Sequence, residues 1–366
     1  MNSLANYRKA FLILTGILIV VGFLALISAS SVIGAQQYND VLYFVKKQLL
    51  QGLLIGLILA LIASKINFRV WQKLSFWLLL LNIFLLILCF VPGFERVING
   101  AHRWIKLGPI LFQPSELLKV TIILFLANIF NKYHNEPTSK ALSKTFLIYL
   151  FTIGIISLLL AVQPSTGTFV IILLSTLAMY FINKITGKQI LILIILGIFF
   201  FSILISKYNY RLDRILTFLN PSKDPKGSGY QILQSLIGIG TGGIFGKGFG
   251  NSVQKFNYLP ESHTDAIFAI IAEETGFIGS VVLLLIYLLF ITTGLKLAKY
   301  TNNYFGQLVI IGFITSIGLQ AFINIAALCH MIPLTGIPLP FISYGSSAYI
   351  TNLIQIGIIM NITKQS

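Results

Sequence analysis

Long apolar runs constrain this chain more than any other feature. A helix of roughly 20 apolar residues crosses the ~30 Å hydrocarbon core of a bilayer. Only 10% of the residues are charged, whereas soluble domains carry roughly 25%, so a solvated globular surface is excluded. We predict an all-α polytopic membrane protein in which residues 1–366 form a single transmembrane domain of about ten helices. The predicted spans lie near 9–28, 44–64, 73–92, 113–131, 145–162, 167–183, 188–206, 265–295, 304–328 and 342–362.

Basic residues gather at one set of span ends. Cytoplasmic ends of membrane helices collect Lys and Arg, so we predict that these ends, and with them both termini, are cytoplasmic. A net charge of +16 would suggest nucleic acid in a soluble protein. Here membrane topology and an anionic lipid surface explain it, and we expect no nucleic-acid partner. Against the single acid Glu136, these ends carry Arg8, Lys9, Lys65, Arg69, Lys73, Lys132, Lys140, Lys144, Lys184, Lys188, Lys296, Lys299 and Lys364.

The opposite side is predicted to carry one long extracytoplasmic loop, residues 207–264, between spans seven and eight. A loop of this length is uncommon without a function, and this one is basic. A solvated tether explains it adequately, but an anion site for a phosphorylated lipid explains it better. Its stretch GIGTGGIFGKGFG (Gly238–Gly250) contains the pattern G-x-G-x-x-G. Without a preceding strand that pattern does not indicate a dinucleotide site, so we predict a tightly folded or re-entrant loop beside the membrane.

Charged residues inside spans are costly and usually pair or carry function. In the fourth span, Glu116 and Lys119 are three residues apart and share a helix face. They form either a neutralising ion pair or a polar wall of a substrate cavity. The eighth span begins with Asp265, and Glu273 follows eight residues later, close to the same helix face. We expect Asp265 at the outer membrane boundary, where an aqueous active site is reachable.

Three long motifs resemble the SEDS family of cell-wall polymerases. They are NGAHRWIKLGPILFQPSELLKV (Asn99–Val120), GNSVQKFNYLPESHTDAIFAIIAEETGFIG (Gly250–Gly279) and PLTGIPLPFISYGSS (Pro333–Ser347). The resemblance extends over essentially the whole chain, and GNSVQKFNYLPE is closer to the septal than to the elongation branch. It implies a ten-span fold that polymerises lipid II into glycan strands at the outer face of a bacterial cytoplasmic membrane, with undecaprenyl diphosphate as the leaving group.

The resemblance also implies partners and a catalytic residue. The partners are a class B penicillin-binding protein, which is a transpeptidase, and other membrane proteins of the divisome at the septum. The catalytic acid of the His-Thr-Asp motif falls on Asp265. The chain departs from the family pattern at QPSTGT, where Ser165 replaces an acid. That replacement puts a cation or second-carboxylate role at Ser165 in doubt and leaves Asp265 untouched.

Inverting glycosyl transfer needs a base for the attacking hydroxyl and positive charge for the leaving diphosphate. We predict Asp265 as the base and expect the helix N-terminus and nearby cations to lower its pKa. The sequence identifies no cofactor with certainty; a divalent cation is compatible with the diphosphate, but the sequence shows no dedicated metal ligands. A lipid II transporter or flippase and a non-catalytic divisome scaffold are the alternative functions. The candidate substrate-binding residues are Arg103, Trp104, Glu116, Lys119, Lys255, Glu261, His263 and Ser343.

Overall fold

The computed structural model describes residues 2–98, 101–107, 110–134, 138–182, 186–193, 195–197, 214, 216–225, 227 and 229–365. Helices dominate it. The helical elements are α1 (Asn2–Tyr38), α2 (Tyr43–Lys47), the π-helix η1 (Gln48–Leu54), α3 (Ile55–Lys65), α4 (Phe68–Leu88), α5 (Pro114–Tyr133), α6 (Thr138–Val162), α7 (Thr166–Ile182), the short 3₁₀ helix η2 (Pro221–Lys223), α10 (Tyr230–Thr241), α11 (Ile267–Lys299), α12 (Tyr304–Leu328) and α13 (Ser346–Lys364).

The predicted polytopic helical class is confirmed. Within the described residues, seven helical stretches are long and apolar enough to cross a bilayer, and α7 is a shorter apolar helix of 17 residues. Span nine was predicted at 304–328 and coincides with α12, whereas α4 begins five residues before the predicted third span. Most of predicted span seven, 188–206, lies outside the described residues, so a total of ten remains a prediction.

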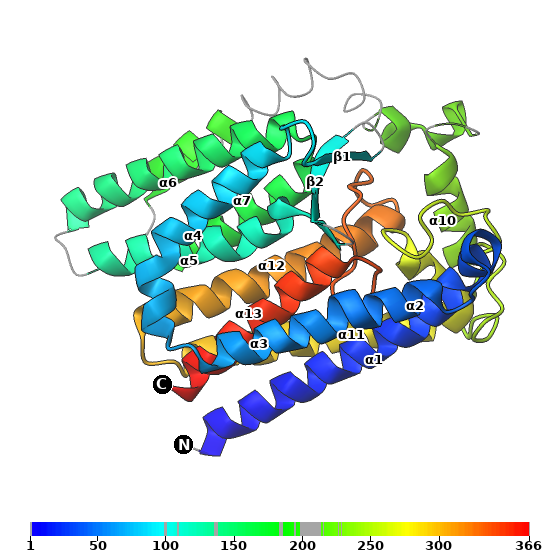
Figure 1. The fold of residues 1–366 in the computed structure, drawn as a ribbon, viewed down its shortest axis with the longest axis horizontal. Helices are drawn as coiled ribbons and strands as arrows, with labels where there is room; N and C mark the ends of the chain where they lie inside the picture. The colour runs from blue at the N-terminus through cyan, green and yellow to red at the C-terminus, as the bar shows by residue number, and fades with distance from the viewer. Residues whose placement is uncertain are drawn as a thin grey trace.

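The helices lie side by side, and both termini are at the same end of the bundle (Figure 1). α3 packs on α13, α4 on α5, and α11 on both α1 and α12. The centre is formed by α5 and α12, which are largely buried. α1, α3, α4 and α11 instead expose large apolar side chains along their outer faces, as lipid contact requires. Basic last turns of α3, α5, α11 and α13 lie at the end that carries the termini.

A small antiparallel sheet lies at the other end, between α4 and α5 (Figure 1). Its strands are β1 (Glu95–Ile98), β2 (Ala101–Leu107) and β3 (Ile110–Phe112), in the order β1-β2-β3. The all-α prediction omitted it because strands this short are hidden beside twenty-residue helices. A signal was nevertheless present: Asn99-Gly100 separates the paired residues Ile98 and Ala101, and Asn-Gly is a strong hairpin signal.

α11 is interrupted at Gly276, where φ is 67° and ψ is −163°. This conformation is essentially restricted to glycine. The backbone groups freed by the break are paired with the glycine-rich loop 242–250. Phe277 N and Ile278 N donate to the carbonyls of Gly243 and Ile244 at 2.9 and 3.2 Å. Lys247 N and Gly248 N donate to the carbonyls of Glu273 and Glu274, each at 3.0 Å. The tight loop predicted at Gly238–Gly250 is therefore found from Gly242 to Gly250, whereas the prediction was wrong for Gly238–Thr241, which form the last turn of α10.

We expect Gly276→Ala to destabilise the protein by about 2 kcal/mol or more, because an alanine is strained at this φ and ψ. Its Cβ would also meet Gly246 N and lie 2.6 Å from Ile244 O. The measurement is thermal unfolding in detergent. Gly240→Ala is the matched control, because Gly240 is exposed on α10 and a Cβ there has nothing within 4 Å. Equal melting temperatures for the two variants would contradict the prediction.

Candidate functional site

Asp265 is presented by a tight turn that precedes α11. Thr264 N and Ala266 N both donate to the carbonyl of Glu261 at 3.1 Å, and Glu261 has φ 54°. The helix begins at Ile267, with Ala266 as N-cap. Asp265 therefore lies just outside the span whose first residue it was predicted to be, so it does not share a helix face with Glu273.

Asn324 of α12 fixes the backbone of Asp265. Its Nδ2 donates to the carbonyls of Asp265 and Ile337, each at 2.7 Å. Because both partners are acceptors, the amide nitrogen faces them, and Asn324 Oδ1 is left buried without a protein partner among the described residues. Gly336, with φ 65°, lies beneath the carboxyl group: a Cβ there would be 3.3 Å from Asp265 Oδ2.

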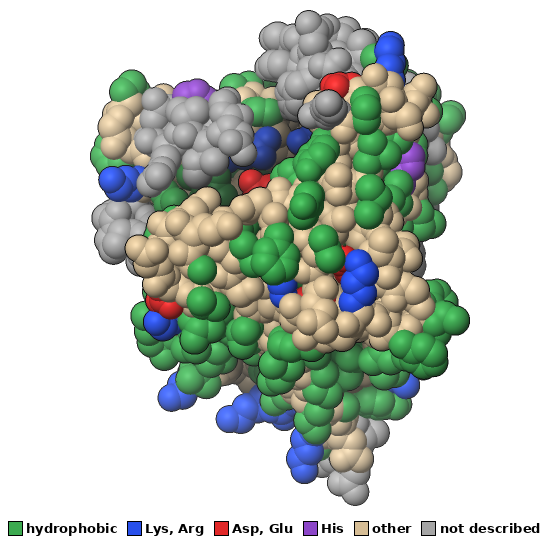
Figure 2. Space-filling view, turned by 90° about the vertical axis from the view of Figure 1, so that its right-hand side faces the viewer, with side chains coloured by type: hydrophobic (Ala, Val, Ile, Leu, Met, Phe, Trp, Pro, Cys, Tyr) green, Lys and Arg blue, Asp and Glu red, His purple; other side chains and the backbone are tan. Residues whose placement is uncertain are grey.

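These groups surround a cavity of about 50 Å³. One water requires only about 10–15 Å³, so the cavity admits a hydroxyl group or a few waters. Arg214 reaches it from the predicted long loop and donates Nη1 to the carbonyl of Leu334 at 3.1 Å. Figure 2 looks onto this end of the molecule and shows acidic and basic side chains recessed among hydrophobic and backbone surface. The lining residues are Arg214, Gln231, Asp265, Asn324, Ala327, Leu328, Leu334, Thr335, Gly336 and Ile337.

The pKa of the Asp265 carboxyl group is raised towards neutral pH. Burial raises its pKa to about 6, and the negative charge of Glu261 adds to the effect. The hydrogen bond from Thr264 and the positive charge of Arg214 act in the opposite direction. The sequence predicted a lowered pKa, and that direction is wrong because loss of solvation outweighs the cation. A carboxylate with this pKa is ionised at pH 7 and is a stronger base than an exposed one.

Glu116 and Lys119 form the ion pair that was one of their two interpretations. Lys119 Nζ lies 2.7 Å from Glu116 Oε2 and donates to Gln320 Oε1 at 2.6 Å, and both charged side chains are buried. Gln320 Nε2 in turn donates to the carbonyl of Pro338 at 2.8 Å. Since Asn324 is one helical turn after Gln320 and holds Ile337, the pair supports the same segment that closes the Asp265 cavity.

Arg103 and Trp104 lie on β2, and Ser343 lies in the loop before α13. Arg103 donates Nε to the carbonyl of Gln163 at 3.0 Å and Nη2 to the carbonyl of Pro164, directly before Ser165. It thereby joins the sheet to the α6–α7 turn. The hydroxyl of Ser343 accepts from Leu339 N at 2.8 Å and closes a turn within its own loop. Substrate binding by these three residues stays a prediction.

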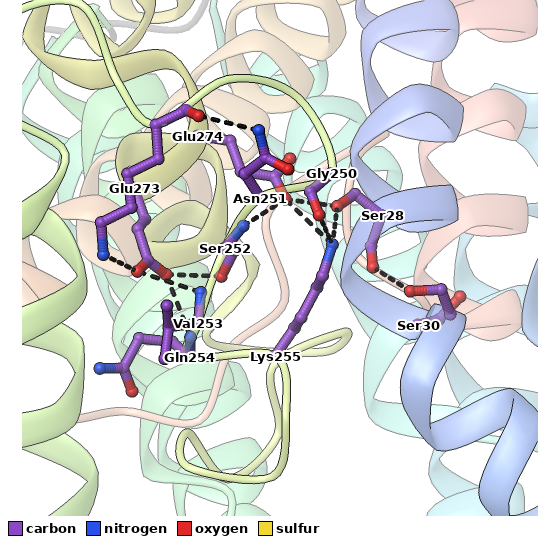
Figure 3. A network of polar contacts seen from close by, with 12 residues as sticks. Ser28, Ser30, Gly250, Asn251, Ser252, Val253, Gln254, Lys255, Glu273 and Glu274 are labelled. Carbon is purple, nitrogen blue, oxygen red and sulfur yellow. Dashed lines mark hydrogen bonds and ion pairs between the residues drawn. The ribbon is translucent and has the colours of Figure 1, made fainter.

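Lys255 has internal partners in a network that joins the loop to α1 and α11 (Figure 3). Its buried Nζ donates to Gly250 O, Ser28 Oγ and Glu274 Oε1 at 2.5, 3.1 and 3.4 Å. In the same network Glu273 accepts from Lys247 Nζ at 2.6 Å and from the backbone of Val253 and Gln254 at 3.2 Å each. Both acids of α11 and Lys255 therefore hold the loop in place, and a substrate contact by Lys255 stays a prediction.

His263 and Glu261 precede Asp265 closely in the sequence, but their side chains contact other groups. The His263 ring packs 4.4 Å from the Phe44 ring and 5.8 Å from that of Tyr344, and burial lowers the pKa of His263. Glu261 is exposed, and its Oε2 accepts from Thr264 Oγ1 at 2.6 Å. Glu261 influences the site through its charge on Asp265. Direct substrate contacts by these two residues stay predictions.

Sequence reasoning missed Arg214, Asn324 and Gln231 as residues of the Asp265 cavity. Arg214 was one of several loop cations, and nothing in its local pattern distinguishes it. Gln320 and Asn324 did carry a signal: two amides one turn apart in an otherwise apolar span are expensive unless they bind something. That signal was missed because the prediction considered only charged residues within the spans.

Among the described residues, the cavity offers a divalent cation one carboxylate, that of Asp265. Within the described residues, no group of three or more His, Cys, Asp or Glu is placed to hold a metal ion. The cavity offers the carboxylate of Asp265 next to the guanidinium of Arg214, whose positive charge would repel a cation. No step proposed below uses a metal.

Comparison with known proteins agrees with this architecture. The chain is 36% identical over 354 residues to stage V sporulation protein E of Bacillus subtilis, covering 97% of this chain and 96% of that one. It is 38% identical over 364 residues to the probable peptidoglycan glycosyltransferase FtsW of Coxiella burnetii, covering 99% and 97%. Among solved structures, a chain from a peptidoglycan synthase complex that coordinates polymerization and crosslinking superimposes with a TM-score of 0.76 at 27% identity, covering 97% of each chain. The cell cycle protein family of FtsW, RodA and SpoVE matches residues 8–366, and this chain belongs to that family, as its SEDS-like motifs predicted.

Proposed function

We propose that this chain is a peptidoglycan glycosyltransferase that polymerises lipid II at the outer face of the cytoplasmic membrane. One observation carries the proposal: Asp265, Arg214 and Asn324 line one cavity. A carboxylate with a pKa of about 6 and a cation are the groups that transfer from a diphosphate to a hydroxyl requires. The name of the Coxiella burnetii relative supports the same activity.

In the proposed reaction Asp265 acts as general base. The sugar 4-hydroxyl of an incoming lipid-linked disaccharide donates its proton to the Asp265 carboxylate. Its oxygen forms a bond to the anomeric carbon of the growing glycan as the bond from that carbon to undecaprenyl diphosphate breaks. Attack from the side opposite the leaving group inverts the anomeric centre. The proton ends on Asp265 and the negative charge on the departing diphosphate.

Arg214 and Asn324 have separate roles in this mechanism. The guanidinium of Arg214 faces the charge that develops on the diphosphate, where a fixed cation stabilises the transition state. Asn324 holds the backbone carbonyls of Asp265 and Ile337 through its Nδ2 and thereby positions the Asp265 carboxylate. A cavity of about 50 Å³ holds only the reacting groups, so the rest of the disaccharide lies over the outer surface.

The proposed base predicts a pH dependence. Asp265 must be ionised, and its pKa is raised to about 6. Activity should therefore fall as the pH falls through about 6, by about tenfold for each further unit. Glu261→Gln removes a charge that raises this pKa and should move the midpoint to lower pH. The measurement is kcat/KM for lipid II between pH 5 and about pH 8; an unmoved midpoint in Glu261→Gln would contradict the assignment.

Orientation and partners complete the proposal. The chain is a multi-pass membrane protein, and we place both termini and the basic helix ends in the cytoplasm. This leaves the Asp265 cavity on the outer side, where lipid-linked sugars are polymerised. A class B penicillin-binding protein is the proposed partner, supported by the matched chain's place in a synthase complex that polymerizes and crosslinks. Other divisome proteins and a location at the septum follow from the sequence motifs.

The direct test is polymerisation of purified lipid II in proteoliposomes, with and without the transpeptidase partner. Glycan product from this chain is expected, and its yield should rise with the partner present. A transporter would move lipid II across the bilayer without lengthening it. A scaffold would neither move lipid II across the bilayer nor lengthen it. Lipid II that stays monomeric with the partner present would refute the proposal.

A further inference from the structure

The glycine-rich loop exposes large apolar side chains at its tip. Phe245 is 81% exposed, Ile244 62% and Phe249 58%; we call these three residues the loop tip. Contiguous exposed apolar surface of this kind marks an interaction site. The depth of the loop tip relative to the bilayer indicates what covers it. The neighbouring helices α1 and α11 each give the position of the membrane boundary.

Both helices give the same position for the membrane boundaries. At the basic end, Lys296 Nζ of α11 lies 5.2 Å from the ring centre of Tyr7 of α1. At the other end, Ser28 Oγ donates to Glu274 Oε1 at 2.5 Å, so these residues lie at one level. Twenty residues separate Arg8 from Ser28, and twenty separate Gly276 from Lys296. Each length corresponds to about 30 Å of helix, the thickness of the hydrocarbon core.

The lipid-facing surface agrees with that level. On α1 the exposed large apolar side chains recur from Leu12 to Leu24, just before Ser28, and beyond Ser28 the next one is Tyr38 at the end of the helix. On α11 they begin at Phe277, which is 67% exposed, and Ile278, which is 46% exposed, whereas Ile267 to Ala272 are buried. The level of Ser28, Glu274 and Gly276 is therefore the outer boundary of the hydrocarbon core.

The loop tip is joined to the membrane side of this boundary. Ile244 accepts from the backbone of Ile278 at 3.2 Å, and Gly243 accepts from Phe277 at 2.9 Å. We propose that the loop tip is inserted into the outer leaflet beside Phe277 and Ile278, so that outer-leaflet lipid covers Ile244, Phe245 and Phe249. The surface is continuous with the lipid-facing side of α11, and insertion of Ile and Phe side chains into a bilayer is favourable.

Insertion also explains why the break at Gly276 is so completely paired. Irregular backbone at membrane depth is stable only where its N–H and C=O groups are satisfied. The loop supplies these partners on both sides of Gly276, through Gly243 and Ile244 on one side and Lys247 and Gly248 on the other. The loop thus presents apolar side chains to lipid while its backbone is bonded to α11.

The segment that follows the glycine-rich loop contains a control. Asn257 Nδ2 donates to Gln36 Oε1 of α1 at 2.6 Å. Gln36 is eight residues beyond Ser28, which corresponds to about 12 Å further out. Tyr258, although aromatic and 52% exposed, is therefore assigned to the aqueous side.

The test places a nitroxide on single cysteines in the full-length protein reconstituted into phosphatidylethanolamine–phosphatidylglycerol vesicles. The native cysteines Cys89 and Cys329 are first replaced by alanine. Labels go on Phe245→Cys, on Phe277→Cys as the lipid reference and on Tyr258→Cys as the water reference. Collisions with oxygen, which partitions into lipid, are compared with collisions with a water-soluble nickel chelate.

We expect the oxygen-to-nickel ratio at position 245 to match that at position 277 and to exceed that at position 258 several-fold. A ratio at 245 equal to that at 258 overturns the proposal. Low access to both reagents at 245 also overturns it, because protein would then cover the loop tip. Ile244→Cys repeats the measurement at a second exposed site. The result does not depend on whether the chain polymerises lipid II.

Discussion

Asp265→Asn is expected to reduce glycan polymerisation by about 10²–10⁴-fold and to leave the fold intact. The substitution keeps the size of the side chain and removes its ability to accept a proton. The fold should survive because Asn324 holds residue 265 through its backbone carbonyl, at 2.7 Å, and that contact does not depend on the side chain. The measurement is glycan yield from purified lipid II, combined with melting temperature in detergent.

Asp224→Asn is the matched control, since it makes the same chemical change on an exposed side chain that does not line the Asp265 cavity. It should retain activity above pH 7 and have the same melting temperature as the wild type. Full activity in Asp265→Asn would remove Asp265 as the base. Loss of activity together with a lowered melting temperature would show that the carboxylate is structural, which contradicts the prediction equally.

The membrane-spanning helices were predictable because one physical requirement dominates them. Each must present about 20 apolar residues to lipid, and that requirement is written locally in the sequence. The resemblance of the long motifs identified the family and predicted Asp265 as its catalytic residue. Folding of Gly242–Gly250 into a tight loop was also predictable, because glycine repeats tolerate positive φ and close backbone approach.

The surroundings of Asp265 were not predictable because they depend on contacts between distant segments. Arg214, Asn324 and Gly336 reach the cavity from the long loop, from α12 and from the loop that follows it. The direction of the Asp265 pKa shift was wrong because desolvation depends on how closely these segments pack. Lys255 was chosen as an outer cation, but its sequence position does not reveal that Ser28, far away on α1, binds it.

Lys119→Met is expected to cost about 3–5 kcal/mol of stability, because it leaves the buried carboxylate of Glu116 without its partner. Lys119 is 1% exposed and Glu116 3% exposed, and Nζ also donates to Gln320 Oε1. The measurement is the change in unfolding free energy in detergent. The control is Lys46→Met, which breaks an exposed ion pair of the same 2.7 Å length with Asp40 and should leave stability nearly unchanged.

The double variant Glu116→Leu/Lys119→Met distinguishes the charge from the packing. Replacing a whole buried pair with apolar side chains is often nearly neutral, whereas breaking it is not. The double variant should therefore recover most of the stability lost in Lys119→Met, and a loss equal to the sum of the single variants would contradict the argument. Recovery should be incomplete, because Gln320 Oε1 still lacks its donor.

Gln320 holds Pro338, beside the Ile337 carbonyl that Asn324 binds. Polymerisation should therefore stay impaired in the double variant even where stability returns, because the segment that closes the Asp265 cavity has lost part of its support.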